Sequence, residues 1–128
     1  MTVIDTSALI AILLGEPDAH LFAKALETIE EPVLSAASYV ELCLVMKHKK
    51  GEQSKSIIDQ LIAEARIEIA PVSSTQAEIA YSSHVKFPVL NYGDTFSYAL
   101  AKELDAPLLF KGNDFSVTDL KVYPTDQT

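Results

Sequence analysis

The stretch VIDTSALIAIL, residues 3–13, decides the fold of this chain. Its opening valine and isoleucine are β-branched and favour a short strand that ends at Asp5. A helix is expected to follow from Ser7 to Leu14, where Gly15 and Pro17 end the pattern. A strand that passes through an acidic residue into a helix is typical of α/β proteins, which bind ligands at the carboxyl ends of their strands.

The rest of the chain continues this alternation of short apolar runs and helical stretches. Further helices are expected at Asp18–Glu30, Ser38–Lys50, Ser54–Ala65, Ser73 or Ser74 to His84, and Asp94–Leu104. Further strands are expected around Val33–Leu34, Ile67–Val72, Leu108–Phe110 and Val122. Pro88 and Gly93 predict a loop over Lys86–Gly93. The alternation predicts a three-layer α/β/α domain with a mainly parallel central sheet.

The composition is that of one globular domain spanning residues 1–128. Apolar residues make up 48% of the chain, so we expect no extended disorder. Cys43 is the only cysteine, which excludes an internal disulfide and a multi-cysteine zinc site. The longest apolar run, Ala8–Leu14, is far shorter than the roughly 20 residues of a membrane helix. No basic segment precedes it, so we expect a cytoplasmic protein without a membrane span.

The formal net charge of −8 argues against a broad nucleic-acid-binding face. Arg66 is the only arginine, so an arginine-rich surface is excluded. Residues 47–50, however, form a local basic cluster of three lysines and His48. A divalent metal ion can also invert the sign of an acidic pocket. Net charge alone therefore does not exclude a nucleic-acid partner.

Two aspartates follow predicted strands. Asp5 lies where the first strand ends, and Asp114 follows the strand Leu108–Phe110 after a short turn. In a parallel sheet the carboxyl ends of the strands share one edge, so these side chains are expected to lie near each other. The alternative for Asp5 is a purely structural role as the N-cap of the next helix, and Asp114 alone could be an ordinary turn residue.

Glu41 interrupts an otherwise apolar stretch of the helix expected at Ser38–Lys50. Because this stretch is apolar on every helical face, we expect the helix to be buried. A buried ionised carboxylate is costly unless it is paired or binds a metal ion, and no basic residue lies within one turn. The alternative is a capping box, since Ser38 and Glu41 have the S-x-x-E spacing.

Asp94 stands at the start of another predicted helix, after Asn91 and Gly93. A helix cap is again the alternative explanation. Together, however, the sequence places carboxylates at two strand ends and on two helices that pack on the same sheet. Oxygen ligands of this kind select Mg²⁺ or Mn²⁺. Two such ions about 4 Å apart could activate water for attack on phosphorus.

Four segments of the chain, by their order and spacing, indicate a family resemblance. They are VIDTSALIAIL (3–13), SAASYVELCLVM (35–46), LNYGDTFSYALAKEL (90–104) and APLLFKGNDFSVTDL (106–120). In this order they resemble the PIN-domain family, and specifically the VapC-type toxins of bacterial toxin–antitoxin pairs. The segments cover the chain nearly from end to end.

This resemblance implies an acidic metal site that cleaves RNA with Mg²⁺, or Mn²⁺, as cofactor. The implied catalytic and metal-binding residues are Asp5, Glu41, Asp94 and Asp114, with Asp5 and Asp94 as direct ligands. The implied supporting residues are Thr6, Ser7 and Asn113, together with Asp119, which could support Asp114 or replace it.

The resemblance also implies two protein partners. One is a cognate antitoxin that places a basic side chain in the acidic pocket. The other is a second copy of the chain, and the apolar residues of Leu9–Leu14 exceed what one buried helix face requires, so a homodimer could cover them.

Two other functions are compatible with a small acidic α/β domain. A receiver-type phosphoacceptor switch would share the length, the parallel sheet and a magnesium pocket. Here Asp5 has no acidic neighbour, and Ala70–Val72 offers no phosphoacceptor, so only Lys111 agrees with that class. A catalytically silent module with the PIN fold is the second alternative, against which the intact set of carboxylates argues.

Overall fold

The computed structural model describes residues 1–125. In these residues the strands are β1 (Thr2–Ile4), β2 (Pro32–Ser35), β3 (Glu68–Ala70) and β4 (Leu108–Leu109). The helices are α1 (Thr6–Leu13), α2 (Ala19–Thr28), α3 (Ala36–Lys50), α4 (Ser54–Glu64), α5 (Ser74–Lys86) and α6 (Tyr92–Leu104). The expected order of helices and strands is therefore confirmed, except for the strand expected around Val122.

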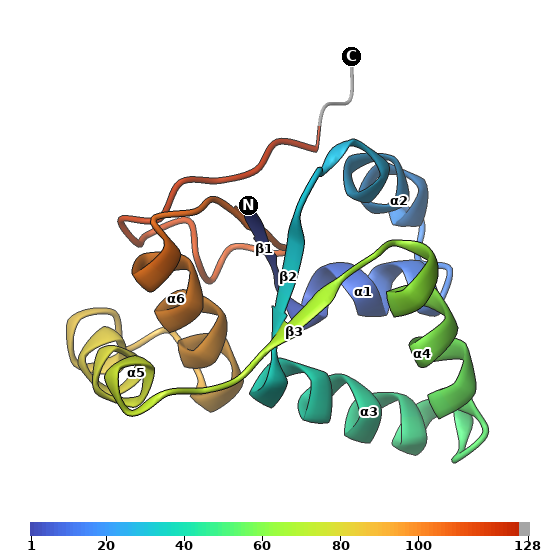
Figure 1. The fold of residues 1–128 in the computed structure, drawn as a ribbon, viewed down its shortest axis with the longest axis horizontal. Helices are drawn as coiled ribbons and strands as arrows, with labels where there is room; N and C mark the ends of the chain where they lie inside the picture. Colours follow the sequence, from blue (N-terminus) through green and yellow to red (C-terminus); the bar gives the residue numbers. More distant parts are fainter. Residues whose placement is uncertain (126–128) are drawn as a thin grey trace.

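The strands form one parallel sheet in the order β3-β2-β1-β4. Val3 of β1 pairs with Val33 of β2 on one side and with Leu108 of β4 on the other. Figure 1 shows the sheet between two groups of helices, with α5 and α6 on one side and α1, α2 and α4 on the other. The three-layer α/β/α prediction is thus confirmed.

Successive residues of the central strands point into two separate cores. Ile4, Leu34 and Leu109 pack with residues of α1, α2, α3 and α4. The residue before each of them, Val3, Val33 or Leu108, packs instead with α6 and its neighbours. This alternation follows from the two-residue period of a strand, and because helices cover both faces, both sets of strand residues are apolar.

The last predicted strand is wrong. Val122 makes only an isolated parallel bridge to Leu108, and no strand forms around it in the part of the chain that the structure describes. Two backbone hydrogen bonds hold the segment there: Leu108 N–H donates to the Lys121 carbonyl at 2.9 Å and Tyr123 N–H donates to the Leu108 carbonyl at 2.9 Å.

Two expectations about helix burial need correction. In α3, Leu42 and Met46 are buried, but Val40 and Leu44 are each 53% exposed, so one face of this helix reaches the surface. In Leu9–Leu14, by contrast, every side chain is buried or packs partly buried against the core, much of it against α2. That segment is therefore not a free apolar surface for a second copy. Among residues 1–125, no helix has the length and apolar character to span a bilayer.

Candidate active site

Asp5 is placed by the turn between β1 and α1. It is the N-cap of α1, and its Oδ2 accepts hydrogen bonds from Ser7 N at 3.0 Å and Ser7 Oγ at 2.7 Å. Its Oδ1 accepts from Ser97 Oγ at 2.6 Å, and the residue is only 4% exposed. The capping interpretation is therefore correct, and the cap also fixes the direction of the carboxylate at the carboxyl end of β1.

Ser97 was not predicted as a site residue. It is fully buried on α6, where its hydroxyl contacts Ser38 Oγ at 3.3 Å as well as Asp5. Its spacing from Asp94 could have identified it, because residues three positions apart lie on the same face of a helix. A small polar residue on the same helix face as Asp94 is a candidate partner for a buried acid.

Lys111 follows β4, and its backbone is hydrogen-bonded to the first turn of α1, just after β1. Its backbone N–H donates to Ser7 Oγ at 2.9 Å, so the Ser7 hydroxyl connects Lys111 to Asp5. Its Nζ lies 2.8 Å from Glu16 Oε1 and 2.9 Å from Asp18 Oδ1, in the turn between α1 and α2. The ammonium group is thus bound to this turn, which agrees with a structural role and not with the phosphoacceptor chemistry of a receiver domain.

Asp94 lies in the first turn of α6, which begins two residues earlier than predicted because Asn91 caps it. Asn91 Oδ1 accepts from Asp94 N at 2.9 Å, and Asp94 Oδ2 accepts from Asn91 N at 3.0 Å, which together form a capping box. Burial raises the pKa of Asp94 to about 7, against the bond from Asn91, and repulsion from Asp5 and Asp114 adds to the rise. The capping interpretation is therefore correct for Asp94 as well, and the cap holds its carboxylate near Asp5 and Asp114.

Glu41 projects from α3 and is partly buried. Burial raises its pKa; a hydrogen bond from the Thr6 hydroxyl opposes this, and the charge of Asp5 adds to it. The capping-box alternative is wrong, because α3 begins at Ala36 and its cap is Ser35, whose Oγ accepts from Ala37 N at 3.2 Å. The helix begins earlier than the sequence predicts, so Glu41 lies beyond its first turn.

Asp114 and Asn113 follow β4 in an exposed loop. The Asn113 carbonyl accepts a hydrogen bond from Ser116 N at 3.1 Å, which closes the turn. Asp114 is near enough to Asp94 that its charge and a side-chain hydrogen bond raise the pKa of Asp94. The structure therefore brings Asp114 into the group of carboxylates.

Asp119 makes its contacts away from the other carboxylates. Its Oδ1 accepts from Tyr98 Oη at 2.7 Å, and its Oδ2 lies 3.0 Å from Lys102 Nζ and 3.9 Å from Lys86 Nζ. These contacts lower the pKa of Asp119, with the Tyr98 hydrogen bond as the largest cause. Asp119 thus anchors the closing segment to α6, and it does not replace Asp114 beside Asp94.

The residues of this site have the donor chemistry that a divalent ion requires. Asp5, Glu41, Asp94 and Asp114 supply only oxygen ligands, and within residues 1–125 none of them has a lysine or arginine at ion-pair distance. In the same residues no three acidic, His or Cys side chains already stand close enough to hold an ion. Binding would therefore require the carboxylates to move closer. It would offset the burial, and relieve the repulsion from Asp5 and Asp114, that together raise the pKa of Asp94.

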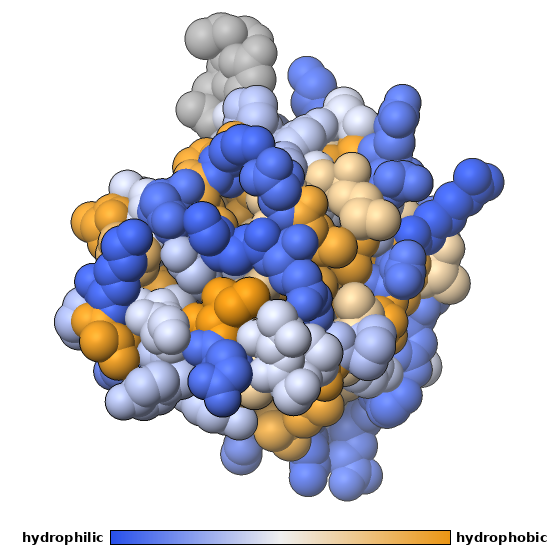
Figure 2. Space-filling view, turned by 60° about the vertical axis from the view of Figure 1, so that its left-hand side comes forward, coloured by the Kyte–Doolittle hydropathy of each residue, from blue (hydrophilic) through white to orange (hydrophobic). Residues whose placement is uncertain are grey.

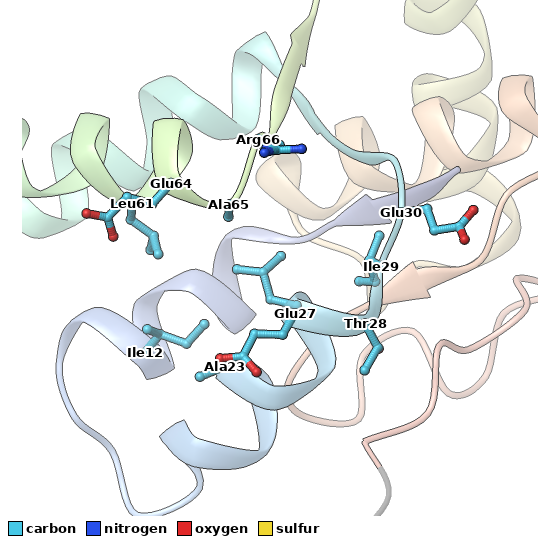
Figure 3. A pocket seen from close by; sticks show the side chains of 11 residues that line it. Ile12, Ala23, Glu27, Thr28, Ile29, Glu30, Leu61, Glu64, Ala65 and Arg66 are labelled. Atoms are coloured by element: carbon cyan, nitrogen blue, oxygen red, sulfur yellow. The ribbon is translucent and has the colours of Figure 1, made fainter.

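One cavity lies away from these acids. It has a volume of about 580 Å³ and is lined by α1, α2, α4 and the segments that precede β2 and β3. Figure 3 shows Ile12, Ala23 and Leu61 around it, with Glu27 and Arg66 nearby. Because it lies where parallel strands β2 and β3 begin, it is at the opposite edge of the sheet from Asp5. We call it the amino-edge groove.

A second apolar region extends over α3, α6 and α5. Two adjoining hollows of about 480 and 410 Å³ share Tyr92 and Phe96, and the first is also lined by Val40, Leu44, Glu41 and Gly93. Figure 2 shows apolar side chains at the surface on the side where α5 and α6 lie. We call this region the α3–α6–α5 surface.

Comparison with known proteins identifies the family. The model of the PIN domain matches residues 2–121. Ribonuclease VapC42 of Mycobacterium tuberculosis is 37% identical over 126 residues, which are 93% of this chain and 96% of the relative. Ribonuclease VapC30 of the same species is 42% identical over 124 residues, with 92% and 95% covered.

Solved structures agree on the fold. The structure of VapC20 of Mycobacterium tuberculosis, described as a sarcin–ricin loop cleaving toxin, superposes with a TM-score of 0.82 at 15% identity, covering 97% of this chain and all of that one. A toxin–antitoxin complex from Klebsiella pneumoniae superposes with a TM-score of 0.76 at 20% identity over the whole of both chains. The receiver-type alternative is therefore wrong, and this chain belongs to the PIN-domain family, within its VapC group.

Proposed function

We propose that this protein is a metal-dependent endoribonuclease and the toxin of a toxin–antitoxin pair. The observation that carries the proposal is the group of four carboxylates at the carboxyl edge of the sheet, which lacks a cationic partner in residues 1–125. Relatives of nearly equal length at 37 to 42% identity are named VapC ribonucleases, which supports the reaction class. A cytoplasmic location stays a prediction.

The proposed cofactor is Mg²⁺, with Mn²⁺ as a substitute, held by Asp5, Glu41, Asp94 and Asp114. When bound, such an ion lowers the pKa of water and stabilises charge on a phosphodiester. The chain's own part is to hold the ligands: Ser7 and Ser97 orient Asp5, and Asn91 orients Asp94. The raised pKa of Asp94 means that it must lose its proton before it can act as a ligand.

RNA requires cations that are free to contact phosphate. Lys111 is bound by Glu16 and Asp18, so it does not meet this condition. The exposed lysines at the end of α3, in residues 47–50, do. His48 of this cluster lies seven residues, or about two turns, after Glu41, so both residues face the same side of α3, and both line one hollow. We therefore propose that this basic cluster binds the RNA backbone beside the carboxylates.

A cleavage assay on unstructured RNA tests this function. We expect cleavage with Mg²⁺ or Mn²⁺, none in chelator, and a loss of about a thousandfold with Asp94→Asn, as with Asp5→Asn. The matched control is Asp105→Asn at the other end of α6, an exposed aspartate in the left-handed conformation that asparagine also adopts. Cleavage that persists in chelator would remove the proposed mechanism. A protein that binds metal but does not cleave would be the catalytically silent module.

The proposed antitoxin inhibits by placing an Arg or Lys among the carboxylates. Desolvated acids that repel one another attract such a cation, which then competes with Mg²⁺. Toxin–antitoxin complexes among the similar structures support a protein partner. With the purified partner, we expect inhibition to weaken when Mg²⁺ is raised or when the basic residue becomes Ala. Inhibition that ignores both changes would instead indicate that the partner only blocks access.

The proposed homodimer uses the α3–α6–α5 surface and not residues 9–14. This surface exposes Val40, Leu44, Tyr81 and Tyr92. Glu41 is the only acidic residue that lines its two hollows, so a protein of charge −8 can pair there with little repulsion. We expect a dimer in sedimentation at micromolar concentration and a monomer with Leu44→Glu. A dimer that survives this change would place the interface elsewhere.

A further inference from the structure

Gly93 lies directly against the carboxylate of Glu41. A Cβ built on Gly93 would stand 2.0 Å from Glu41 Oε2, 2.6 Å from Cδ and 2.7 Å from Oε1. Real Cβ atoms do not approach other heavy atoms below 3.0 Å. All three atoms of the carboxyl group therefore occupy the space that any side chain at position 93 would need.

The backbone does not explain a glycine at this position. Gly15, Gly51 and Gly112 have positive φ angles, which favour glycine, but Gly93 does not have one and lies in the first turn of α6. Glycine is among the least favourable residues in a helix. The structural reason for Gly93 is thus the space that it leaves for Glu41.

This space determines where Glu41 can lie relative to the other acids. Gly93 immediately precedes Asp94, and Glu41 comes from a different helix, α3. Contact with the Gly93 backbone therefore brings the Glu41 carboxylate against the same helical turn that carries Asp94. Any side chain at position 93 would push the end of Glu41 away from that turn.

We propose that Gly93 is a positioning residue that keeps the Glu41 carboxylate within reach of the metal shared with Asp5 and Asp94. This inference rests on the proposed metal-dependent function. It predicts that the smallest possible side chain at position 93 impairs the site without impairing the helix. It also predicts that an acid one methylene shorter at position 41 relieves the conflict.

The test uses three full-length variants: Gly93→Ala, Glu41→Asp, and the two combined. For Gly93→Ala we expect a melting temperature in chelator equal to or above that of the unchanged protein, because alanine favours the helix. We expect its Mn²⁺ affinity, measured by calorimetry, to fall about 10- to 100-fold, the range for residues that orient a ligand. The kcat of cleavage should fall with it.

The combined variant distinguishes a contact from a general effect. Glu41→Asp should weaken Mn²⁺ binding in the unchanged protein but strengthen it in the Gly93→Ala protein. If Gly93→Ala lowers the melting temperature instead, recovery by Glu41→Asp also supports the contact. Unchanged Mn²⁺ affinity in Gly93→Ala, or independent effects of the two substitutions, would overturn the inference. If the unchanged protein binds no Mn²⁺, the proposed function fails, whereas the melting temperatures still test the contact.

Discussion

The carboxylate site and the amino-edge groove lie at opposite edges of the same sheet, and they differ in the residues that form them. The site gathers four acids around helix caps, where Asp5 and Asp94 each accept backbone hydrogen bonds. The groove is a hollow of about 580 Å³ with apolar residues such as Ile12 and Leu61 in its wall. It holds none of the residues that the sequence predicted for chemistry.

This difference shows that size and chemistry are separate criteria for a functional site. A large hollow between helices arises where short side chains such as Ala23 and Ala65 leave space. A metal site instead requires a few groups whose directions are fixed by hydrogen bonds, and it needs little volume. If the two ends of the sheet are independent, substitutions in the groove should leave the carboxylate site unaffected.

The largest effect is expected from Asp5→Asn. This change removes the charge of a ligand at constant volume, and the amide cannot accept all the hydrogen bonds that Ser7 and Ser97 donate. Loss of several kcal/mol of metal-assisted stabilisation corresponds to a fall of about a thousandfold in kcat/KM. Single-turnover cleavage measures it, and circular dichroism checks the fold. Near-normal cleavage by a folded variant would exclude Asp5 from the chemistry.

A smaller effect is expected from Ser97→Ala. The variant leaves Oδ1 of Asp5 without its donor, so the carboxylate can turn, and we expect a loss of about 10- to 100-fold in Mn²⁺ affinity. Ser82→Ala on α5 is the matched control, because Ser82 is exposed and distant in the fold from β1. Equal metal affinity of both variants would show that Ser97 only fills space.

The next prediction concerns pH and metal-free stability. The pKa of Asp94 is about 7 in the folded state and near 3.8 when unfolded, so the folded state binds more protons between these values. Its contribution to stability is therefore complete below pH 3.8 and is lost as pH rises through about 7. In chelator we expect the melting temperature to fall from pH 5 to pH 8, less steeply in Asp94→Asn.

Excess Mg²⁺ should reverse this fall at pH 8, because it replaces the proton as the partner of the ionised carboxylate. The unfolding transition followed by calorimetry at both pH values, with and without Mg²⁺, measures the effect. An identical slope in the Asp94→Asn variant would show that another group causes it.

The smallest effect is expected from Ala23→Arg, which fills the amino-edge groove. Ala23 is partly exposed and makes none of the contacts of the carboxylate site, so cleavage should stay within about twofold and stability within about 0.5 kcal/mol. The RNA assay and thermal unfolding measure both. A strong loss of cleavage would show that the two edges of the sheet are coupled.

The sequence predicted the sheet and the acids because both leave local signals. Val3 and Ile4 mark a strand, and Asp5 marks its end. It did not predict Ser97, whose role depends on a hydrogen bond between residues 92 positions apart. The capping box at Ser38 and Glu41 failed for a similar reason: local spacing suited it, but Ser35 caps the helix earlier. The strand predicted around Val122 does not form, because one apolar residue does not specify a ladder of paired residues.

The hydrogen bond from Lys111 to Ser7 joins residues 104 positions apart, and Asp114 follows just after it. Asp5 is translated 109 residues before Asp114, an interval of about 5 to 20 s at ordinary rates of synthesis. The strand order places β1 between β2 and β4, so the sheet around Asp5 is incomplete until β4 has left the ribosome. The carboxylates that we propose for catalysis therefore come together only after most of the chain has been made.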